Sequence, residues 1–470
     1  MTRAEAWALY RRGPRATVAA LLALARRVAT LEARLGQTSQ NSSRPPSSDP
    51  PAVPRLRRPP SGRRPGGQPG HPGRTRPLVP VDQVQAVHPV KPSHCGRCGA
   101  PLRGADPTPL RHQVTEVPPV APHITEYQLH TLVCRCGAPT RAALPPGVPP
   151  GAFGPRLQAL VAVCTGLYRL SRRTTVGLVA DCFGVELALG SVTACEQAVS
   201  AALAAPVAAA HAHVQRQPVA HVDETGWREG RRRAWLWVAA TATVTVFLVH
   251  ARRGAVAAQA LLGRFAGIRV TDRWTAYLAW PLRSRQLCWA HLRRHFVAFA
   301  ETPGGAGRLG EALLAETAQL FAWWHRVRDG TLARSSFRTY LGPLRQRVEA
   351  LLRQGTRCPH PKTAAMCREI LALAPALWTF VRVAGVEPTN NAAERALRPG
   401  VLWRKGSFGS HSAAGSRFAE RIMTVAATLT QQRRNVVRYV TQACEAALHA
   451  EPAPTLLPAP VRSRKLRRAA

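Results

Sequence analysis

Apolar residues near the start of the chain follow the spacing of an amphipathic helix. Steps of three and four residues join Leu21, Leu24, Val28, Leu31 and Leu35. This spacing predicts a helix over residues 17–36 that carries the a/d face of a coiled coil. The face is shorter than three heptads, so pairing with a second copy and docking on the chain's own body both stay open.

Residues 37–80 break this pattern. They are rich in Pro, Gly and Arg and bury too little apolar surface to fold alone, so we expect a basic linker. Such a linker could follow a DNA backbone through its arginines without reading the base sequence.

Helical spacing returns over residues 156–210. Arg172 and Arg173 lead into one helix, and a second helix follows a glycine turn at Gly184. Two short helices around such a turn are typical of a DNA-reading helix-turn-helix, and equally of ordinary packed helices. We expect a helical domain here and keep both interpretations.

From residue 215 the pattern changes to short β-branched and apolar runs. The predicted order is three strands, a helix, a strand, a helix, a strand and a helix, at 218–223, 233–238, 243–250, 255–265, 268–272, 274–277, 286–289 and 290–300. This is the order of the ribonuclease H-like fold, in which the first and fourth strands are neighbours. Asp223 and Asp272 end these two strands and should therefore meet in space.

Residues 303–385 interrupt this pattern with Leu- and Ala-rich helical sequence, which we interpret as an all-α insertion. Beyond it, Asn390 is expected to cap a helix that Pro399 ends soon afterwards. Glu394 and Arg398 lie one turn apart on this helix. In isolation, a capped surface helix with an ordinary ion pair would explain the segment.

Composition adds a partner to this picture. The chain of 470 residues has a formal net charge of +40 and a pI near 11.6, which favours a polyanionic partner, most simply double-stranded DNA. A basic membrane-surface protein is the runner-up, but no run reaches the roughly 18 apolar residues of a spanning helix, so we expect no membrane. The 11 cysteines are odd in number and scattered, which fits a reducing cytoplasm better than a disulfide scaffold.

Four of the cysteines form two close pairs, each followed by glycine. The pairs are Cys95 with Cys98 and Cys134 with Cys136. They resemble the knuckles of a zinc ribbon, in which four thiolates hold a structural Zn²⁺ ion. The second pair has a tight C-x-C spacing, so a histidine could replace one ligand, with candidates His94, His112, His123 and His130. The alternative is a small β-rich module with reduced thiols and no metal.

Asp223, Asp272 and Glu394 together form the candidate catalytic set. Cleavage of a phosphodiester suits two Mg²⁺ ions about 3.5–4 Å apart, which hold the attacking and the leaving oxygen. Carboxylates are the hard oxygen ligands that Mg²⁺ prefers. Glu224 is the rival of Asp223, but neighbouring residues on a strand point to opposite faces of the sheet, and we keep Asp223.

Several blocks of sequence carry a family resemblance. They are His221-Val-Asp-Glu-Thr-Gly-Trp227, Thr271-Asp272 with Tyr277, Cys288-Trp-Ala-His291-Leu-Arg-Arg-His-Phe296, Asn390-Asn-Ala-Ala-Glu394-Arg-Ala-Leu-Arg398-Pro399, Trp403-Arg-Lys-Gly-Ser-Phe-Gly-Ser410 with Gly415, and the tracts at 41–49, 67–71 and 168–172. Together they resemble the transposases of insertion-sequence family sixty-six, over about residues 20–435. The C-x-C pair departs from the zinc-binding region of that family.

The resemblance implies a DNA transposase with an Asp-Asp-Glu triad. By family analogy, Asp223 would bridge two Mg²⁺ ions, with Asp272 and Glu394 completing one site each. A 3′-hydroxyl freed at the element's end would then attack target DNA. The resemblance further implies binding to the element's terminal repeats, a homo-oligomer that joins two ends, a place for accessory proteins of the same element, and a nucleoid-associated location in the bacterial cytoplasm.

Basic residues near the acids are expected to hold DNA phosphates. They are Arg395, Arg398, Arg404 and Lys405 beside Glu394, His291, Arg293 and Arg294 on the preceding helix, and Arg172 and Arg173 of the helical domain. A solvated basic face is the alternative for each. A ribonuclease H-like nuclease of repair or recombination, and an inactive DNA-binding remnant of a transposase, are the other functions left open.

The expected architecture is α/β, a ribonuclease H-like catalytic core with an all-α insertion behind several smaller modules. The predicted segments are an N-terminal coiled-coil helix (1–36), the basic linker (37–80), a zinc-ribbon-like DNA-binding module (81–144), a helical DNA-binding domain (156–210), the first part of the core (215–302), the insertion (303–385), the last part of the core with Glu394 (386–448) and a basic tail (449–470).

Overall fold

The structure, a computed structural model, describes residues 2–38, 42–43 and 76–459. It divides into two compact units, one formed by Met1–Pro51 with Pro122–Ala470 and the other by Ala52–Ala121. The predicted linker and the predicted basic tail lie partly outside the described residues.

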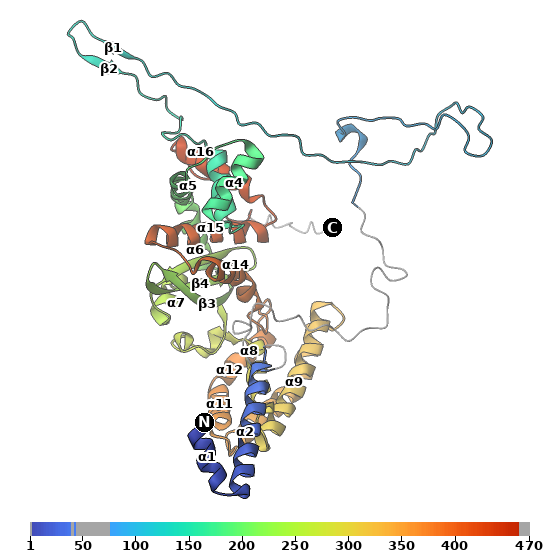
Figure 1. Ribbon diagram of the computed structural model, residues 1–470, viewed down its shortest axis with the longest axis vertical. Helices are drawn as coiled ribbons and strands as arrows, with labels where there is room; N and C mark the ends of the chain where they lie inside the picture. Colours follow the sequence, from blue (N-terminus) through green and yellow to red (C-terminus); the bar gives the residue numbers. More distant parts are fainter. Residues whose placement is uncertain (1, 39–41, 44–75, 460–470) are drawn as a thin grey trace, which may run out of the picture. The chain divides into compact units, whose positions relative to one another are not determined.

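A five-stranded mixed sheet is the centre of the first unit (Figure 1). Its strand order is β5-β4-β3-β6-β7, with antiparallel pairing from β5 to β3 and parallel pairing from β3 to β7. The strands are β3 (Val219–Glu229), β4 (Arg232–Ala240), β5 (Thr245–His250), β6 (Ile268–Thr271) and β7 (Arg285–Leu287). This order is compatible with the predicted ribonuclease H-like core, and it makes the first and fourth predicted strands neighbours.

The first strand of the sheet is longer than predicted. The predicted strand ends at residue 223, before the turn residue Gly226, but β3 continues to Glu229 and the chain reverses at Gly230, which has a φ of +57°. Gly226 lies inside the strand, beside the end of the Arg404 side chain. A Cβ atom there would lie 2.9 Å from the Arg404 guanidinium, so glycine makes room for a side chain from a distant helix.

One face of the sheet is covered by α14 (Asn391–Ser407), which Figure 1 shows beside β3 and β4. The approach is close, because a Cβ atom on Gly400 would lie 2.4 Å from Leu236 of β4. The prediction that Pro399 ends this helix is wrong, since the helix continues for eight residues beyond it. Pro399 is exposed, so water can bind the carbonyl group that loses its helical partner.

The edge of the sheet at β5 is covered by α15 (Ala413–Gln431). Backbone N–H groups of Thr245 and Phe247 donate to the hydroxyls of Thr428 and Thr424, each over 3.1 Å. The next outward N–H group, that of Val249, donates to the Glu420 carboxylate over 2.6 Å. Side chains of a helix thus satisfy an edge strand that would otherwise be open to pairing with another chain.

The inserted segment is helical, as its sequence pattern predicted. After α8 (Trp289–Ala300) it contains α9 (Gly305–Arg328), α10 (Arg334–Gly355), α11 (Pro361–Ala372), α12 (Ala374–Leu377) and α13 (Thr379–Arg382). These helices share a core with β6, β7 and α8. The insertion therefore packs against the end of the sheet at which Asp272 lies.

The remaining helices of the first unit surround the sheet or precede it. They are α1 (Arg3–Arg11), α2 (Pro14–Leu35), α3 (Pro155–Gly166), α4 (Arg172–Phe183), α5 (Leu189–Ala202), α6 (Ala204–Val214), α7 (Ala255–Leu262) and α16 (Val436–Leu448). The predicted helix at 17–36 is present as α2, and its five apolar seam residues are exposed. Whether they pair with a second copy stays a prediction.

The predicted pair of helices around Gly184 is also present. α4 ends at Gly184 in the left-handed conformation, and α5 follows after a short connection. Their apolar faces share a small core with α3, which includes Val161, Val179 and Val192. Reading of DNA by this pair stays a prediction.

Among the described residues, no single helix has both the length and the apolar composition to cross a membrane. The bent pair α5 and α6 passes that test when the two helices are taken together, with 48° between them.

Candidate active site

Asp223 and Glu224 separate onto the two faces of the sheet. Glu224 is buried on the face opposite α14, where it accepts hydrogen bonds from Arg253, over 2.9 Å, and from the hydroxyl of Tyr277. Trp237 of β4 lies opposite Glu224 in the β3–β4 pair and packs edge-on against Tyr277. The Glu224 carboxylate is thus bound within the protein, and Asp223 is the acid that faces α14.

Asp272 lies beside Asp223. His221 of β3 pairs with Val270 of β6 in parallel register, and each aspartate follows two residues later on its own strand. The Asp272 carboxylate accepts a 2.8 Å hydrogen bond from the backbone N–H of Trp274, which holds it at the strand end. Asp272 lies just beyond the carboxyl end of β6, and Asp223 lies beside it within the longer β3, so both acids lie at the edge where the β3–β6 pairing ends.

Asn390 connects the third acid to this edge. Its side-chain amide donates to the carbonyl of Val222 over 2.8 Å, and its carbonyl oxygen lies 3.3 Å from the ring of His221. Its backbone N–H donates to the thiol of Cys288. Asn390 stands at the N-cap of α14 as predicted, but its side chain does not cap the helix, because it binds β3 instead.

The three acids lie within electrostatic reach of one another. Burial raises the pKa of Asp223 well above its ordinary value, and the charges of Glu224, Asp272 and Glu394 raise this pKa further. Like charges at such proximity favour either a bound proton or a bound cation. Three segments far apart in the sequence, each carrying one predicted carboxylate, thus meet in one cluster.

His291 extends this cluster with a nitrogen donor. Its Nδ1 atom lies 3.6 Å from a carboxylate oxygen of Glu394, is buried, and has no hydrogen-bond partner in the described part of the chain. Burial lowers the pKa of His291, so the neutral ring with a free lone pair is favoured. An unsatisfied imidazole nitrogen beside a carboxylate fits a divalent cation.

Cys288 lies next to this pair. Its sulfur, a ring nitrogen of His291 and a carboxylate oxygen of Glu394 all lie within 4.8 Å of one another. Burial raises the pKa of the Cys288 thiol to about 11. Cys288 accepts a hydrogen bond from the backbone N–H of Asn390, and the Glu394 oxygen and the His291 nitrogen are the donors that a hard divalent cation prefers.

The basic residues predicted on α14 divide into two groups. Arg395, Arg398 and Lys405 are exposed and continue the stripe of the helix on which Glu394 lies. Arg404 is half-buried, with its guanidinium over Gly226 of β3. The exposed stripe forms a row of positive charge that begins at the acid cluster.

The other predicted basic residues lie on two further helices. Arg293 and Arg294 follow His291 on α8 and line a cavity between α8 and α9. Arg172 and Arg173 at the start of α4 are both exposed, and Arg172 forms a 2.6 Å ion pair with Glu196 of α5. The Glu196 contact gives Arg172 a structural role within the helical pair.

The predicted zinc-ribbon module spans the boundary between the two units. Cys95 and Cys98 lie in the second unit, in a turn where His94 forms an isolated bridge to Pro101. Cys134 and Cys136 lie in the first unit, in the turn between β1 (Thr131–Val133) and β2 (Pro139–Arg141). The four cysteines are free thiols, and in each pair hydrogen bonds from neighbouring backbone groups, and then from the second thiol, lower the pKa of the first thiol. A zinc site stays a prediction.

Sequence reasoning did not assign the roles of Asn390 and Cys288, or the pairing of His291 with Glu394. Each depends on contacts between segments about 100 residues apart. The only sequence signal for these residues was that each is a polar residue within a short motif of the family resemblance. Which distant residue each one contacts could not be inferred from the spacing.

Two family models match the chain. The model described as transposase IS66 family matches residues 150–418, more than half of the chain. A second model, described as a family of unknown function (DUF6444), matches residues 3–77. A comparison with curated proteins finds no match.

Proposed function

The chain belongs to the IS66 family of transposases, and from this premise we propose that it cuts DNA at the ends of a mobile element and joins the freed 3′ ends to target DNA. The proposed catalytic residues are Asp223, Asp272 and Glu394, on a ribonuclease H-like core. The alternatives are a nuclease that cuts without joining and an inactive remnant that only binds DNA.

One observation carries the proposal. Carboxylates from β3, the end of β6 and α14 lie within electrostatic reach of one another, since burial and then the charges of Glu224, Asp272 and Glu394 raise the pKa of Asp223. Such a cluster is costly for folding, and the backbone hydrogen bonds that Asp223 and Asp272 accept offset only part of this cost. It is therefore best explained as a site for cations and phosphates.

The acids are proposed to hold two Mg²⁺ ions, with the Nδ1 atom of His291 as a further donor beside Glu394. The bound ions would supply Lewis acidity to the phosphate and lower the pKa of an attacking water molecule. This assignment moves His291 from the set of predicted phosphate-binding residues to the cation site. A nitrogen donor also favours Mn²⁺ over Mg²⁺ relative to an all-oxygen site.

Both chemical steps break one bond to a 3′ oxygen. In cleavage, a water oxygen bonds to phosphorus, the bond to the 3′ oxygen breaks, and the products are a 3′-hydroxyl on the element and a 5′-phosphate on the flanking DNA. In joining, that 3′-hydroxyl attacks a target phosphodiester, and a target 3′-hydroxyl leaves. Neither step requires a covalent bond to the protein.

The remaining residues of the site position DNA and the acids. Arg395, Arg398 and Lys405 form the exposed stripe that begins at Glu394, and they would contact successive backbone phosphates. Asn390 acts through Val222 and Cys288, because it fixes the start of α14 against β3 and α8. It is a positioning residue in this account.

The test is a joining assay with a labelled duplex that carries the element's terminal sequence, a supercoiled target plasmid and Mg²⁺. A transposase yields a labelled product joined to the plasmid. The control is a duplex already cut at the element end, whose element strand ends in a 3′-deoxynucleotide, since it lacks the attacking hydroxyl and cannot join. Cleavage without joining would establish the nuclease instead, and binding without cleavage would establish the remnant.

A further inference from the structure

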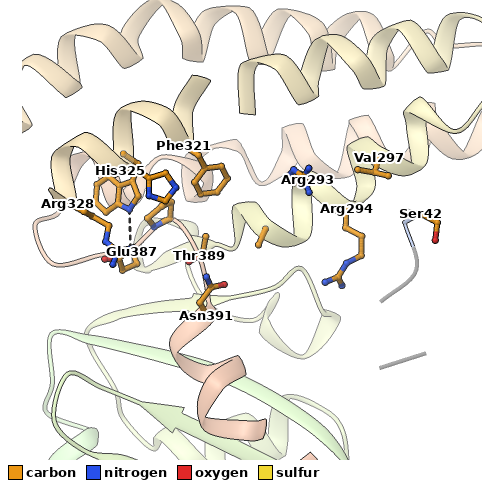
Figure 2. A pocket seen from close by; sticks show the side chains of 13 residues that line it. Ser42, Arg293, Arg294, Val297, Phe321, His325, Arg328, Glu387, Thr389 and Asn391 are labelled. Carbon is orange, nitrogen blue, oxygen red and sulfur yellow. Dashed lines mark hydrogen bonds between the residues drawn. The ribbon is translucent and has the colours of Figure 1, made fainter. Parts of the chain in front are cut away.

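A cavity of about 380 Å³ lies between α8, α9 and the segment that leads into α14. Figure 2 shows Arg293 and Arg294 on its α8 side and Asn391 at the start of α14. The volume lies within the range of ligand pockets, roughly 300–1,000 Å³, and a DNA duplex is far too wide to enter it. A single nucleotide is of suitable size.

The charge of this cavity is positive. Arg293, Arg294 and Arg328 line it together with His325, against one acid, Glu387, in the part of the chain that the structure describes. The Glu387 carboxylate accepts a 3.2 Å hydrogen bond from the Trp324 indole, so part of its hydrogen-bonding capacity is used within the protein. The lining thus suits a phosphate group.

The α9 wall of the cavity is aromatic. The rings of Phe321 and His325, one turn apart, have centroids 6.4 Å apart and an interplanar angle of 36°. Behind them Trp324 is buried and packs against Phe337 and Phe380, with centroid separations of 5.5 and 5.4 Å. A fixed wall with one half-buried ring, one exposed ring and nearby arginines is typical of sites that stack an unpaired base.

The cavity adjoins the acid cluster through two elements that they share. Arg294 follows His291 by three residues on α8, and Asn391 precedes Glu394 by three residues on α14, so each pair lies on one face of its helix. A nucleotide bound in the cavity would therefore belong to the strand whose phosphodiester lies at the acids. The insertion thus contributes a wall to a second site next to the proposed catalytic one.

We propose that this cavity receives one unpaired nucleotide next to the cleaved phosphodiester. Its base stacks on Phe321 and His325, and its phosphate binds Arg293, Arg294 and Arg328. This inference rests on the proposed function, because it takes the DNA strand to lie at Asp223, Asp272 and Glu394. Withdrawing that nucleotide from the duplex costs base pairing, so the site selects DNA whose end is already unpaired or readily opened.

The test compares two duplexes of one sequence, one blunt and one with a three-nucleotide single-stranded overhang. Binding is measured at fixed salt in EDTA, so that cleavage plays no part. Wild type is expected to bind the overhang duplex about tenfold or more tightly than the blunt one. This ratio corresponds to the binding free energy of one to two base-stacking contacts. The double variant Phe321→Ala/His325→Ala should reduce this ratio to near one and leave blunt-duplex affinity unchanged.

Two further variants make the result specific. Tyr340→Ala removes an exposed aromatic ring of the same insertion, on α10 and outside the cavity, and should keep the wild-type ratio. Arg328→Gln changes an exposed residue and should lower the ratio without an effect on folding. No overhang preference in wild type, or equal weakening of both duplexes by the double variant, would overturn the inference.

Failure of this inference differs from failure of the proposed function. If only the nucleotide site is wrong, wild type joins DNA in the plasmid assay but shows no overhang preference. If only the transposase activity is wrong, the overhang preference remains in EDTA and no joined product forms.

Discussion

At the scale of single residues, the alternation of a strand was sufficient to separate the two adjacent acids of β3. Asp223 faces α14, and Glu224 binds Arg253 and Tyr277 on the other side. The same reasoning could not find the bond from Asn390 to Val222, because it joins positions 168 residues apart. The local sequence pattern predicts the face of a strand or helix on which a side chain lies. It does not predict which residue far along the chain that side chain contacts.

Asp223→Asn should stabilise the metal-free protein. The pKa of Asp223 is raised in the folded state, so the folded protein binds this proton more tightly than the unfolded chain does. The resulting contribution to stability is fully present below the unfolded-state pKa, near 3.9, and is lost as the pH rises through the folded-state pKa. At pH 8 in EDTA the unfolded state is therefore favoured by ionisation of this carboxyl group, a penalty that an asparagine does not carry. We expect a melting temperature about 2–4 °C higher for the variant, the shift that ~1 kcal/mol produces in a large domain.

The control for this measurement is Asp329→Asn, which makes the same chemical change at the exposed end of α9 and should leave the melting temperature unchanged. Added Mn²⁺ should stabilise wild type and the control but have less effect on Asp223→Asn. A melting temperature of Asp223→Asn at or below wild type in EDTA would contradict the electrostatic account of the cluster.

Asn390→Ala should slow cleavage by at least about tenfold. The substitution leaves the Val222 carbonyl unpaired beside Asp223 and frees the start of α14, which costs about 1–3 kcal/mol in unfolding free energy. Asn435→Ala is a matched control, since it removes the cap of α16 at about 1 kcal/mol and lies outside the site. Equal cleavage by the two variants at saturating DNA would remove Asn390 from the site.

At the scale of elements, the sequence predicted the strands and helices of the core and misplaced two of their ends. Gly226 and Pro399 are usual signals of a break, yet β3 and α14 pass through them. The reasons are tertiary. Gly226 makes room for Arg404, and Pro399 faces solvent on a helix held by its buried side against β4.

The contact between α8 and α9 offers a test of how the insertion is held. A Cβ atom on Gly310 of α9 would lie 2.3 Å from the backbone nitrogen of Ala300, which cannot move aside as a flexible side chain can. Gly310→Ala should therefore lower the unfolding free energy by about 1–3 kcal/mol. Urea denaturation measures this change.

Gly177→Ala is the control for this substitution. Gly177 lies within α4, and a Cβ atom there would meet nothing within 4 Å. Alanine should raise stability at this position by up to about 1 kcal/mol, because it favours the helix. A neutral or stabilising effect of Gly310→Ala as well would mean that the two helices do not approach so closely.

At the scale of the whole molecule, charge predicted a nucleic-acid partner, and the family match supports a transposase. Whether the four ribbon-like cysteines share one zinc ion stays a prediction, since two of them lie in each unit. The cavity beside the acids could not be foreseen either. Its walls come from α8, α9 and the segment before α14, and only the packed insertion brings them together.

The exposed stripe of α14 should contribute measurably to the salt dependence of DNA binding. Each phosphate contact adds about 0.9 to the slope of log affinity against log salt. Replacing Arg395, Arg398 and Lys405 with Gln should therefore make the slope shallower by about 2.7. The control replaces Arg345, Arg347 and Arg353 of α10, which removes the same charge from residues that pair with glutamates. An equal change in both slopes would mean that only net charge matters.

The central claim is that Asp223, Asp272 and Glu394 form one catalytic site. The most direct test is single-turnover cleavage and joining of the element-end duplex by Asp223→Asn, Asp272→Asn and Glu394→Gln, beside wild type and Asp329→Asn. The account predicts that each of the three variants loses both steps while it still binds the duplex, and that the control keeps both. Cleavage at the wild-type rate by any one of the three would contradict the claim and exclude that carboxylate from the site.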